Sequence, residues 1–276
     1  MTDNQTHQFG ISSLSYPWAV GMAKGPRLKR RLSAFELLEK ARDLGVGLVQ
    51  IADNLPLDDM PWETMVRLKR MASEYEISLE VGTTGTDREH LLKFLEIAHF
   101  LKSPILRTGQ SDTETHLGII GIEKRIRDII PEFEKAGIIM ALENQESHSS
   151  AELAKLIVNV NHPNLRVCLD LSRALGAMEG PREVLDELGP LCGNLLYRDV
   201  VVINSQSSLG YTVEGRPAGK GLIPVKWALE KLRGYEIDHT TIIELWPPWQ
   251  GDIETTVRME NDWVAESVAF MRNLYD

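Results

Sequence analysis

The stretch Ile138-Ile139-Met140-Ala141-Leu142-Glu143 is a run of five apolar residues that ends on a carboxylate. Two later runs have the same form, residues 165–170 (Leu-Arg-Val-Cys-Leu-Asp) and residues 241–244 (Thr-Ile-Ile-Glu). A short apolar run of this kind predicts a buried β-strand, and the acidic residue then lies at the carboxyl end of the strand. In a parallel α/β barrel that end of the strands carries the functional site. We therefore expect Glu143, Asp170 and Glu244 to meet in one site.

The rest of the chain repeats the alternation of short apolar runs with longer amphipathic segments. The strands are predicted at residues 9–14, 47–52, 77–81, 105–107, 138–142, 165–169, 195–201 and 240–243, and the main helices at residues 33–44, 61–75, 87–98, 114–136, 150–159, 181–188, 224–232 and 255–274. Eight strand-then-helix units predict an α/β fold of the (β/α)8 TIM-barrel type, with residues 1–276 as one domain. The alternative, an open doubly wound sheet, commonly has a glycine-rich phosphate loop after its first strand, and none occurs here. The irregular segment 204–221 is expected to cover the mouth of the barrel.

Composition excludes several classes of partner. Lys and Arg number 30 against 40 Asp and Glu, which gives a formal charge of -10 and argues against binding of a nucleic-acid backbone. No run approaches the ~20 apolar residues of a membrane span, and no apolar signal core is present at the start of the sequence. Two cysteines cannot form a disulfide framework. We expect a cytoplasmic protein with no membrane or nucleic-acid partner.

Five segments, in order along the chain, resemble motifs of the xylose-isomerase-like TIM-barrel superfamily of sugar isomerases and epimerases. They are Leu142-Glu143-Asn144, which resembles "IEN"; residues 168–172 (Cys-Leu-Asp-Leu-Ser), which resemble "CLDT"; residues 196–199 (Leu-Tyr-Arg-Asp), where the family has "H-x-K-D"; the glycine-rich lid at 210–221; and residues 243–246 (Ile-Glu-Leu-Trp), which resemble "lElW". The resemblance covers nearly the whole chain. It also implies that homo-oligomers are common among relatives, while the sequence leaves the oligomeric state of this chain open.

This resemblance implies a divalent metal held by Glu, Asp, His and Glu on strands five to eight, with the two glutamates moving a proton beside a carbonyl. Applied to this sequence, the resemblance implies that Glu143 and Glu244 are the catalytic pair and that Glu143, Asp170 and Glu244 are the metal ligands. The histidine position holds Leu196, which cannot bind a metal. Two alternatives follow. Three carboxylates hold Mn²⁺ or Mg²⁺ in preference to Zn²⁺, or no metal is bound because Arg173 or Arg198 neutralises the carboxylates.

Several cationic, aromatic and amide side chains are expected near the same mouth. Arginine binds carboxylate in a bidentate fork, and tryptophan stacks on the apolar face of a sugar. Asp53 and Gln50 of the second strand are further candidates for binding hydroxyl groups. The expected substrate-binding residues are Arg107, Arg173, Arg198, Arg216, Trp18, Trp246 and Asn144.

These residues predict an enzyme for a small sugar or sugar acid, with isomerisation or epimerisation as the first hypothesis. Relatives with a similar Glu-Gly-x-Pro-x-Gly-x-Gly lid look like decarboxylases of oxo sugar acids, so a lyase acting at the same site is the alternative. The third hypothesis is a degenerate barrel that binds a sugar-like ligand without turning it over, because of the departures at Leu196 and Arg173.

Overall fold

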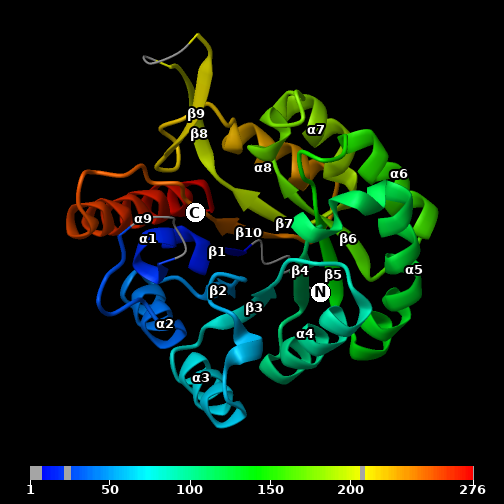
Figure 1. The fold of residues 1–276 in the computed structure, drawn as a ribbon, viewed down its shortest axis with the longest axis horizontal. Coiled ribbons are helices and arrows are strands. Elements are labelled where there is room, and N and C mark those ends of the chain that lie inside the picture. Colours follow the sequence, from blue (N-terminus) through cyan, green and yellow to red (C-terminus); the bar gives the residue numbers. More distant parts are fainter. Residues whose placement is uncertain (1–7, 22–25, 206–208, 276) are drawn as a thin grey trace.

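Eight parallel strands close into a barrel in the computed structural model, which describes residues 8–21, 26–205 and 209–275 (Figure 1). This confirms the predicted TIM-barrel fold. Around the barrel the strands run in the order β1, β10, β7, β6, β5, β4, β3, β2. Their bounds are β1 Gln8–Ser12, β2 Leu48–Ile51, β3 Ser78–Gly82, β4 Ile105–Thr108, β5 Ile139–Glu143, β6 Leu165–Asp170, β7 Cys192–Tyr197 and β10 Thr240–Ile243.

Helices surround the strands and cover their outer face (Figure 1). They are α1 Pro17–Val20, α2 Ala34–Asp43, α3 Trp62–Glu74, α4 Arg88–Leu101, α5 Gly118–Ala136, α6 Ser150–Val160, α7 Pro181–Leu188, α8 Val225–Gly234 and α9 Ile253–Tyr275. The helix predicted over residues 114–136 begins later than expected, because residues 112–117 form a 3-10 helix and α5 begins at Gly118. Among the described residues, none of these helices is long and apolar enough to cross a membrane.

Helix α2 shows how local sequence sets these elements. The Ser33 side chain accepts a hydrogen bond from the Glu36 amide, and the Glu36 carboxylate accepts one from the Ser33 amide. This capping box satisfies amide groups that the first turn leaves without partners. The helix ends before Gly45, which has a positive φ of 63° that glycine adopts without strain. Its buried face packs Leu37 and Leu38 against the barrel.

The barrel interior is layered because every second residue of a strand points inward. The middle layer is apolar and includes Ile105, Ala141, Cys168, Leu196 and Ile242. The residue at the expected histidine position therefore packs in the core, one layer below the carboxyl ends of the strands.

A polar cluster fills the barrel at the amino end of the strands. The Glu80 carboxyl accepts hydrogen bonds from Thr240 Oγ1 at 2.7 Å, Gln50 Nε2 at 3.0 Å and Asn194 Nδ2 at 3.2 Å. Burial outweighs these bonds and raises the pKa of Glu80. The expectation that Gln50 lies at the mouth is wrong, because its side chain lies within the barrel beside Glu80.

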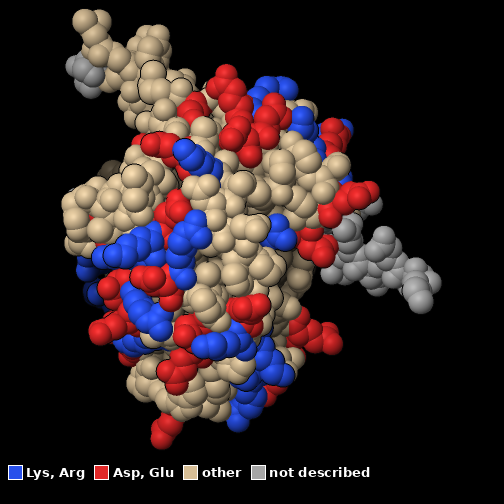
Figure 2. Space-filling model, turned by 90° about the vertical axis from the view of Figure 1, so that its right-hand side faces the viewer, with Lys and Arg blue, Asp and Glu red and all other residues tan. Residues whose placement is uncertain are grey.

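The segment after β7 differs from its prediction. The run expected as one strand to residue 201 ends at Tyr197, and β8 (Asp199–Asn204) then leaves the barrel and pairs antiparallel with β9 (Tyr211–Arg216). The expected irregular lid is therefore largely a β-hairpin. It projects from the top of the barrel in Figures 1 and 2, and residues 200–213 contain no charged side chain.

Glu260 on α9 makes the stability of this fold dependent on pH. Its buried carboxyl accepts hydrogen bonds from the amides of Trp18 at 2.7 Å and Ala19 at 3.0 Å. Burial raises the pKa of Glu260 from 4.5 to about 8, so the folded state holds a proton that the unfolded chain releases. Because the folded pKa is the higher one, this stabilisation is present at low pH and is lost as the pH rises toward 8.

We expect the free energy of unfolding to fall by up to about 4 kcal/mol between pH 5 and pH 8 through this group. Urea unfolding across that range measures the slope. Glu260→Gln should flatten it, and at low pH the variant is less stable than the wild type because its amide nitrogen faces a backbone donor. An equal slope in both proteins would contradict the assignment.

Candidate active site

Five charged side chains form one layer at the carboxyl ends of the strands. Each lies two residues beyond a member of the apolar middle layer, so the period of two that buries the core also turns these side chains into the barrel. Going from strand to strand, the charges are cation, anion, anion, cation, anion. The layer contains Arg107 of β4, Glu143 of β5, Asp170 of β6, Arg198 directly after β7 and Glu244 directly after β10.

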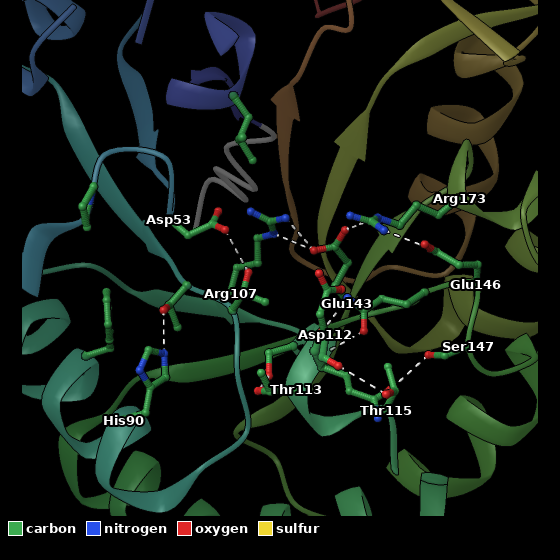
Figure 3. Close-up of a pocket in the computed structure, with 18 of the residues that line it drawn as sticks. Asp53, His90, Arg107, Asp112, Thr113, Thr115, Glu143, Glu146, Ser147 and Arg173 are labelled. Carbon is green, nitrogen blue, oxygen red and sulfur yellow. Dashed lines mark hydrogen bonds and ion pairs between the residues drawn. The ribbon is translucent and has the colours of Figure 1, made fainter. Parts of the chain in front are cut away.

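Glu143 is held between two guanidinium groups. Its Oε2 accepts hydrogen bonds from Arg107 Nε at 2.9 Å and Nη2 at 2.6 Å, and its Oε1 lies 2.8 Å from Arg173 Nε. Figure 3 shows the carboxylate between the two arginines, with Arg173 also reaching Glu146. Burial alone would raise the pKa of Glu143, but Arg107 and Arg173 outweigh it and hold that pKa below its ordinary value.

Arg198 joins the other two carboxylates. Its Nε and Nη2 donate to Glu244 Oε2 at 3.0 and 2.5 Å, and its Nη1 lies 3.0 Å from Asp170 Oδ2. The guanidinium also stacks on Trp246, with 4.5 Å between its central carbon and the ring centroid. These contacts fix Arg198, which is only 3% exposed, against one wall of the barrel.

Asp170 is itself held by backbone and amide groups. Its Oδ1 accepts hydrogen bonds from the amide and hydroxyl of Ser172 at 2.8 and 2.6 Å. Asn144 spans β5 and β6, since its side chain donates to the Asp170 carbonyl and accepts from the Asp170 amide. The structure thus places Asn144 behind Asp170.

An open cavity of about 720 Å³ lies above this layer. Arg107, Glu143, Arg198 and Glu244 form its floor with Arg173 beside them. Loops after β3, β4 and β5 supply hydroxyl groups to its wall, as Figure 3 shows in part, and loops after β2, β4 and β5 supply acidic groups. The hydroxyl residues are Thr83, Thr84, Ser111, Thr113, Thr115 and Ser147, and the acidic residues are Asp53, Asp58, Asp112 and Glu146.

Most of this wall was not predicted from the sequence. Its signal was the concentration of Ser and Thr directly after the third and fourth strands, at 83–86 and 111–115. His90 was expected only as a helix residue, yet it lines the cavity and contacts Thr83 Oγ1 at 2.8 Å. A wall rich in hydroxyl and carboxylate groups suits a ligand that carries several hydroxyl groups.

Four expected substrate-binding residues are not part of the cavity lining, and Asn144, which bonds Asp170, is one of them. Trp18 Nε1 donates to the Pro247 carbonyl at 2.7 Å, and Trp18 packs on Trp249 with 5.2 Å between ring centroids. Arg216 bonds Glu214 and the Gly215 carbonyl within the hairpin. Trp18, Trp246 and Arg216 are not among the residues that line the cavity, although Trp246 stacks on Arg198 of its floor. The described residues of the hairpin do not line it either, and a cover over the mouth stays a prediction.

The carboxylates do not form a metal site in this arrangement. Within residues 8–21, 26–205 and 209–275, no group of three His, Cys, Asp or Glu side chains is placed to hold a metal ion. The carboxylate oxygens of Glu143, Asp170 and Glu244 face guanidinium nitrogens, which compete for the positions that Mn²⁺ or Mg²⁺ would need. The residues therefore fit the second alternative, a cluster neutralised by arginine, better than the first.

Comparisons with known proteins agree with the fold. The sequence model of the family described as "Xylose isomerase-like TIM barrel" matches residues 38–274. The chain is 28% identical over 269 residues to 3-oxo-isoapionate decarboxylase of Pectobacterium atrosepticum, covering 96% of each chain.

Two solved structures share the fold. D-psicose 3-epimerase of Clostridium cellulolyticum H10, solved with D-tagatose, is 15% identical with a TM-score of 0.74, over 98% of this chain and 99% of the other. A xylose isomerase-like protein of Mycobacterium smegmatis, solved in complex with magnesium, is 14% identical with a TM-score of 0.68, over the same shares. The decarboxylase and the epimerase are enzymes.

Proposed function

The chain belongs to the xylose isomerase-like TIM barrel family, and on that premise we propose that it is an enzyme that decarboxylates a 3-oxo sugar acid. In this reaction the bond between the carboxylate carbon C1 and C2 breaks, and its electron pair moves to the C3 oxo oxygen to give an enolate. Carbon dioxide leaves, and C2 takes one proton that comes from water. No oxidant or reductant is needed.

The observation that carries the proposal is the pairing of both glutamates with buried arginines. Isomerisation or epimerisation by proton transfer beside a carbonyl requires a base that removes a proton from carbon, and a carboxylate with a lowered pKa is a weak base. Glu143 is such a carboxylate. Decarboxylation creates the same enolate without a base, because the electron pair comes from the bond to carbon dioxide.

Two further features support this substrate class. Negative charge moves onto the oxo oxygen during the reaction, and the guanidinium groups on the cavity floor are suited to stabilise it. The hydroxyl and carboxylate wall suits the hydroxyl groups of a sugar acid. The curated relative, 28% identical, is a decarboxylase of a 3-oxo acid, which supports the same choice.

The glutamates then have separate roles. Glu143 holds Arg107 and Arg173 in position. Glu244 lines the cavity, and its buried Oε1, 3.8 Å from Arg107 Nη1, has no hydrogen-bond partner in the described part of the chain. It is therefore the group placed to carry a proton from solvent to C2.

Turnover in D₂O separates the hypotheses. With 3-oxo-isoapionate and other 3-oxo sugar acids as substrates, we expect release of one carbon dioxide per molecule and one deuteron at C2 of the product, detected by mass spectrometry and NMR. An isomerase or epimerase would instead exchange deuterium into D-psicose or D-tagatose without carbon dioxide release. Ligand-induced thermal stabilisation with neither reaction would support a binding protein and contradict the proposal.

The remaining expectations stay predictions. A cytoplasmic location and the lack of a nucleic-acid partner are consistent with an acidic enzyme of small-molecule metabolism. Sedimentation velocity measures the oligomeric state directly.

A further inference from the structure

Arg107 and Arg198 contact different oxygens of the same carboxylate, that of Glu244. Arg198 Nη2 lies 2.5 Å from Glu244 Oε2, and Arg107 Nη1 lies 3.8 Å from Glu244 Oε1. Both guanidinium groups are 3% exposed and line the cavity. Two cationic groups are therefore fixed next to one point of the floor.

Each of these guanidinium groups has a buried donor without a hydrogen bond. Arg107 Nη1, 3.8 Å from Glu244 Oε1, and Arg198 Nη1, paired with Asp170 Oδ2 at 3.0 Å, make only these ion-pair contacts and no contact with hydrogen-bond geometry within the described residues. Buried donors in proteins are almost always hydrogen-bonded, so such atoms call for an explanation. Because both nitrogens belong to residues at the cavity floor, a substrate oxygen is the partner that would satisfy them.

A divalent cation fits the same place poorly. Glu143 Oε2 and Glu244 Oε2 each accept two guanidinium hydrogen bonds, and Asp170 Oδ1 accepts from the Ser172 amide and hydroxyl. Three carboxylates already balance the three guanidinium groups of Arg107, Arg173 and Arg198. A metal would add two uncompensated positive charges to a buried cluster, which carries a large desolvation cost.

We propose that the guanidinium groups of Arg107 and Arg198 take the place of a divalent cation in this site, and that Asp170 is the positioning residue for Arg198. The assignment rests on the proposed decarboxylation. The C3 oxo oxygen of the substrate accepts hydrogen bonds from the two Nη1 atoms. As the C1–C2 bond breaks, the electron pair moves to that oxygen, and the two cations stabilise the enolate until C2 takes its proton.

Metal analysis tests the replacement without relying on turnover. Wild-type protein is dialysed against a chelator and then equilibrated with Mn²⁺, and bound metal is measured by elemental analysis. We expect far less than one Mn²⁺ per chain and unchanged decarboxylation after chelation. One Mn²⁺ per chain in the wild type, lost in Glu143→Gln and Glu244→Gln, would overturn the guanidinium centre, whichever reaction the enzyme performs. A wild-type protein that binds no metal and releases no carbon dioxide would instead overturn the proposed function.

Chemical rescue tests the guanidinium directly. Arg198→Ala should lower kcat by about 10²–10³-fold, the usual loss for one oxyanion donor. Guanidinium ion at millimolar concentration, far below the molar range that unfolds proteins, should restore part of the rate in a saturable manner. Methylammonium should not restore the rate. Arg42 is an exposed arginine far from the cavity, so Arg42→Ala should show neither a loss of kcat nor a rescue by guanidinium. Restoration by Mn²⁺, or no rescue in an Arg198→Ala protein whose circular dichroism shows that it is folded at the assay temperature, would overturn the role of Arg198.

The positioning role of Asp170 is tested by non-additivity. Asp170→Asn should lower kcat and leave KM close to its wild-type value, since Asp170 is not among the cavity-lining residues. In the double variant with Arg198→Ala it should cause no further loss, because both substitutions remove one interaction. Additive losses would show that Asp170 acts independently of Arg198 and would overturn this role.

Discussion

Glu244→Gln should lower kcat for decarboxylation by about 10²–10⁴-fold, the range expected when a group that transfers a proton is removed. Glutamine keeps an oxygen for the hydrogen bonds from Arg198 and matches glutamate in size. It cannot carry a proton to C2. The variant should therefore fold, bind substrate and fail at the step that completes the product.

The stereochemistry of the product sharpens this test. In D₂O the wild-type enzyme should deliver its deuteron to one face of C2, because Glu244 lies on one side of the floor. The residual turnover of Glu244→Gln should give deuterium in both configurations, since water then supplies it from solution. NMR of the isolated product distinguishes the two results.

Glu80→Gln is the matched control. Glu80 is another buried glutamate of the barrel, but it lies at the opposite end of the strands and bonds Thr240, Gln50 and Asn194. Because burial raises its pKa, an uncharged glutamine should be well tolerated, and kcat should stay at the wild-type value. Full activity in Glu244→Gln, or equal losses in both variants, would contradict the role of Glu244.

The sequence was most informative where strand periodicity alone decides the structure. Apolar runs that end on Glu143, Asp170 and Glu244 predict strands and the end of the barrel at which these acids gather. The same period of two turns both Leu196 and Arg198 into the barrel, with Leu196 in the core and Arg198 one layer higher, at the mouth. That distinction follows from counting along β7, whose last residue is Tyr197.

Contacts between side chains of different strands were harder to predict from the sequence. Whether Arg173 and Arg198 neutralise the carboxylates depends on side chains from different strands and could only be posed as an alternative to a metal. The hairpin after β7 was missed because its strands lie on both sides of glycine and serine residues typical of an irregular loop. The hydroxyl wall was missed because single Ser and Thr residues in loops carry little signal by themselves.

Arg198→Met should reduce the free energy of unfolding by about 3–5 kcal/mol, the usual cost of removing one partner from a buried ion pair. Methionine fills part of the space over Trp246 but leaves Asp170 and Glu244 as buried carboxylates without this cation. The whole cluster then carries a net negative charge inside the barrel. Urea unfolding at neutral pH measures the loss directly.

A second substitution separates the effect of charge from the effect of packing. Asp170→Asn added to Arg198→Met makes the cluster neutral again, and Asn can keep the oxygen that accepts from Ser172. The double variant should therefore be more stable than Arg198→Met alone, although it lacks two charged groups. Arg42→Met, at an exposed pair with Asp43, should leave the unfolding midpoint unchanged. If the double variant is less stable than Arg198→Met, the loss of stability in Arg198→Met comes from lost packing. The balance of buried charges would then not be what stabilises the floor of the cavity.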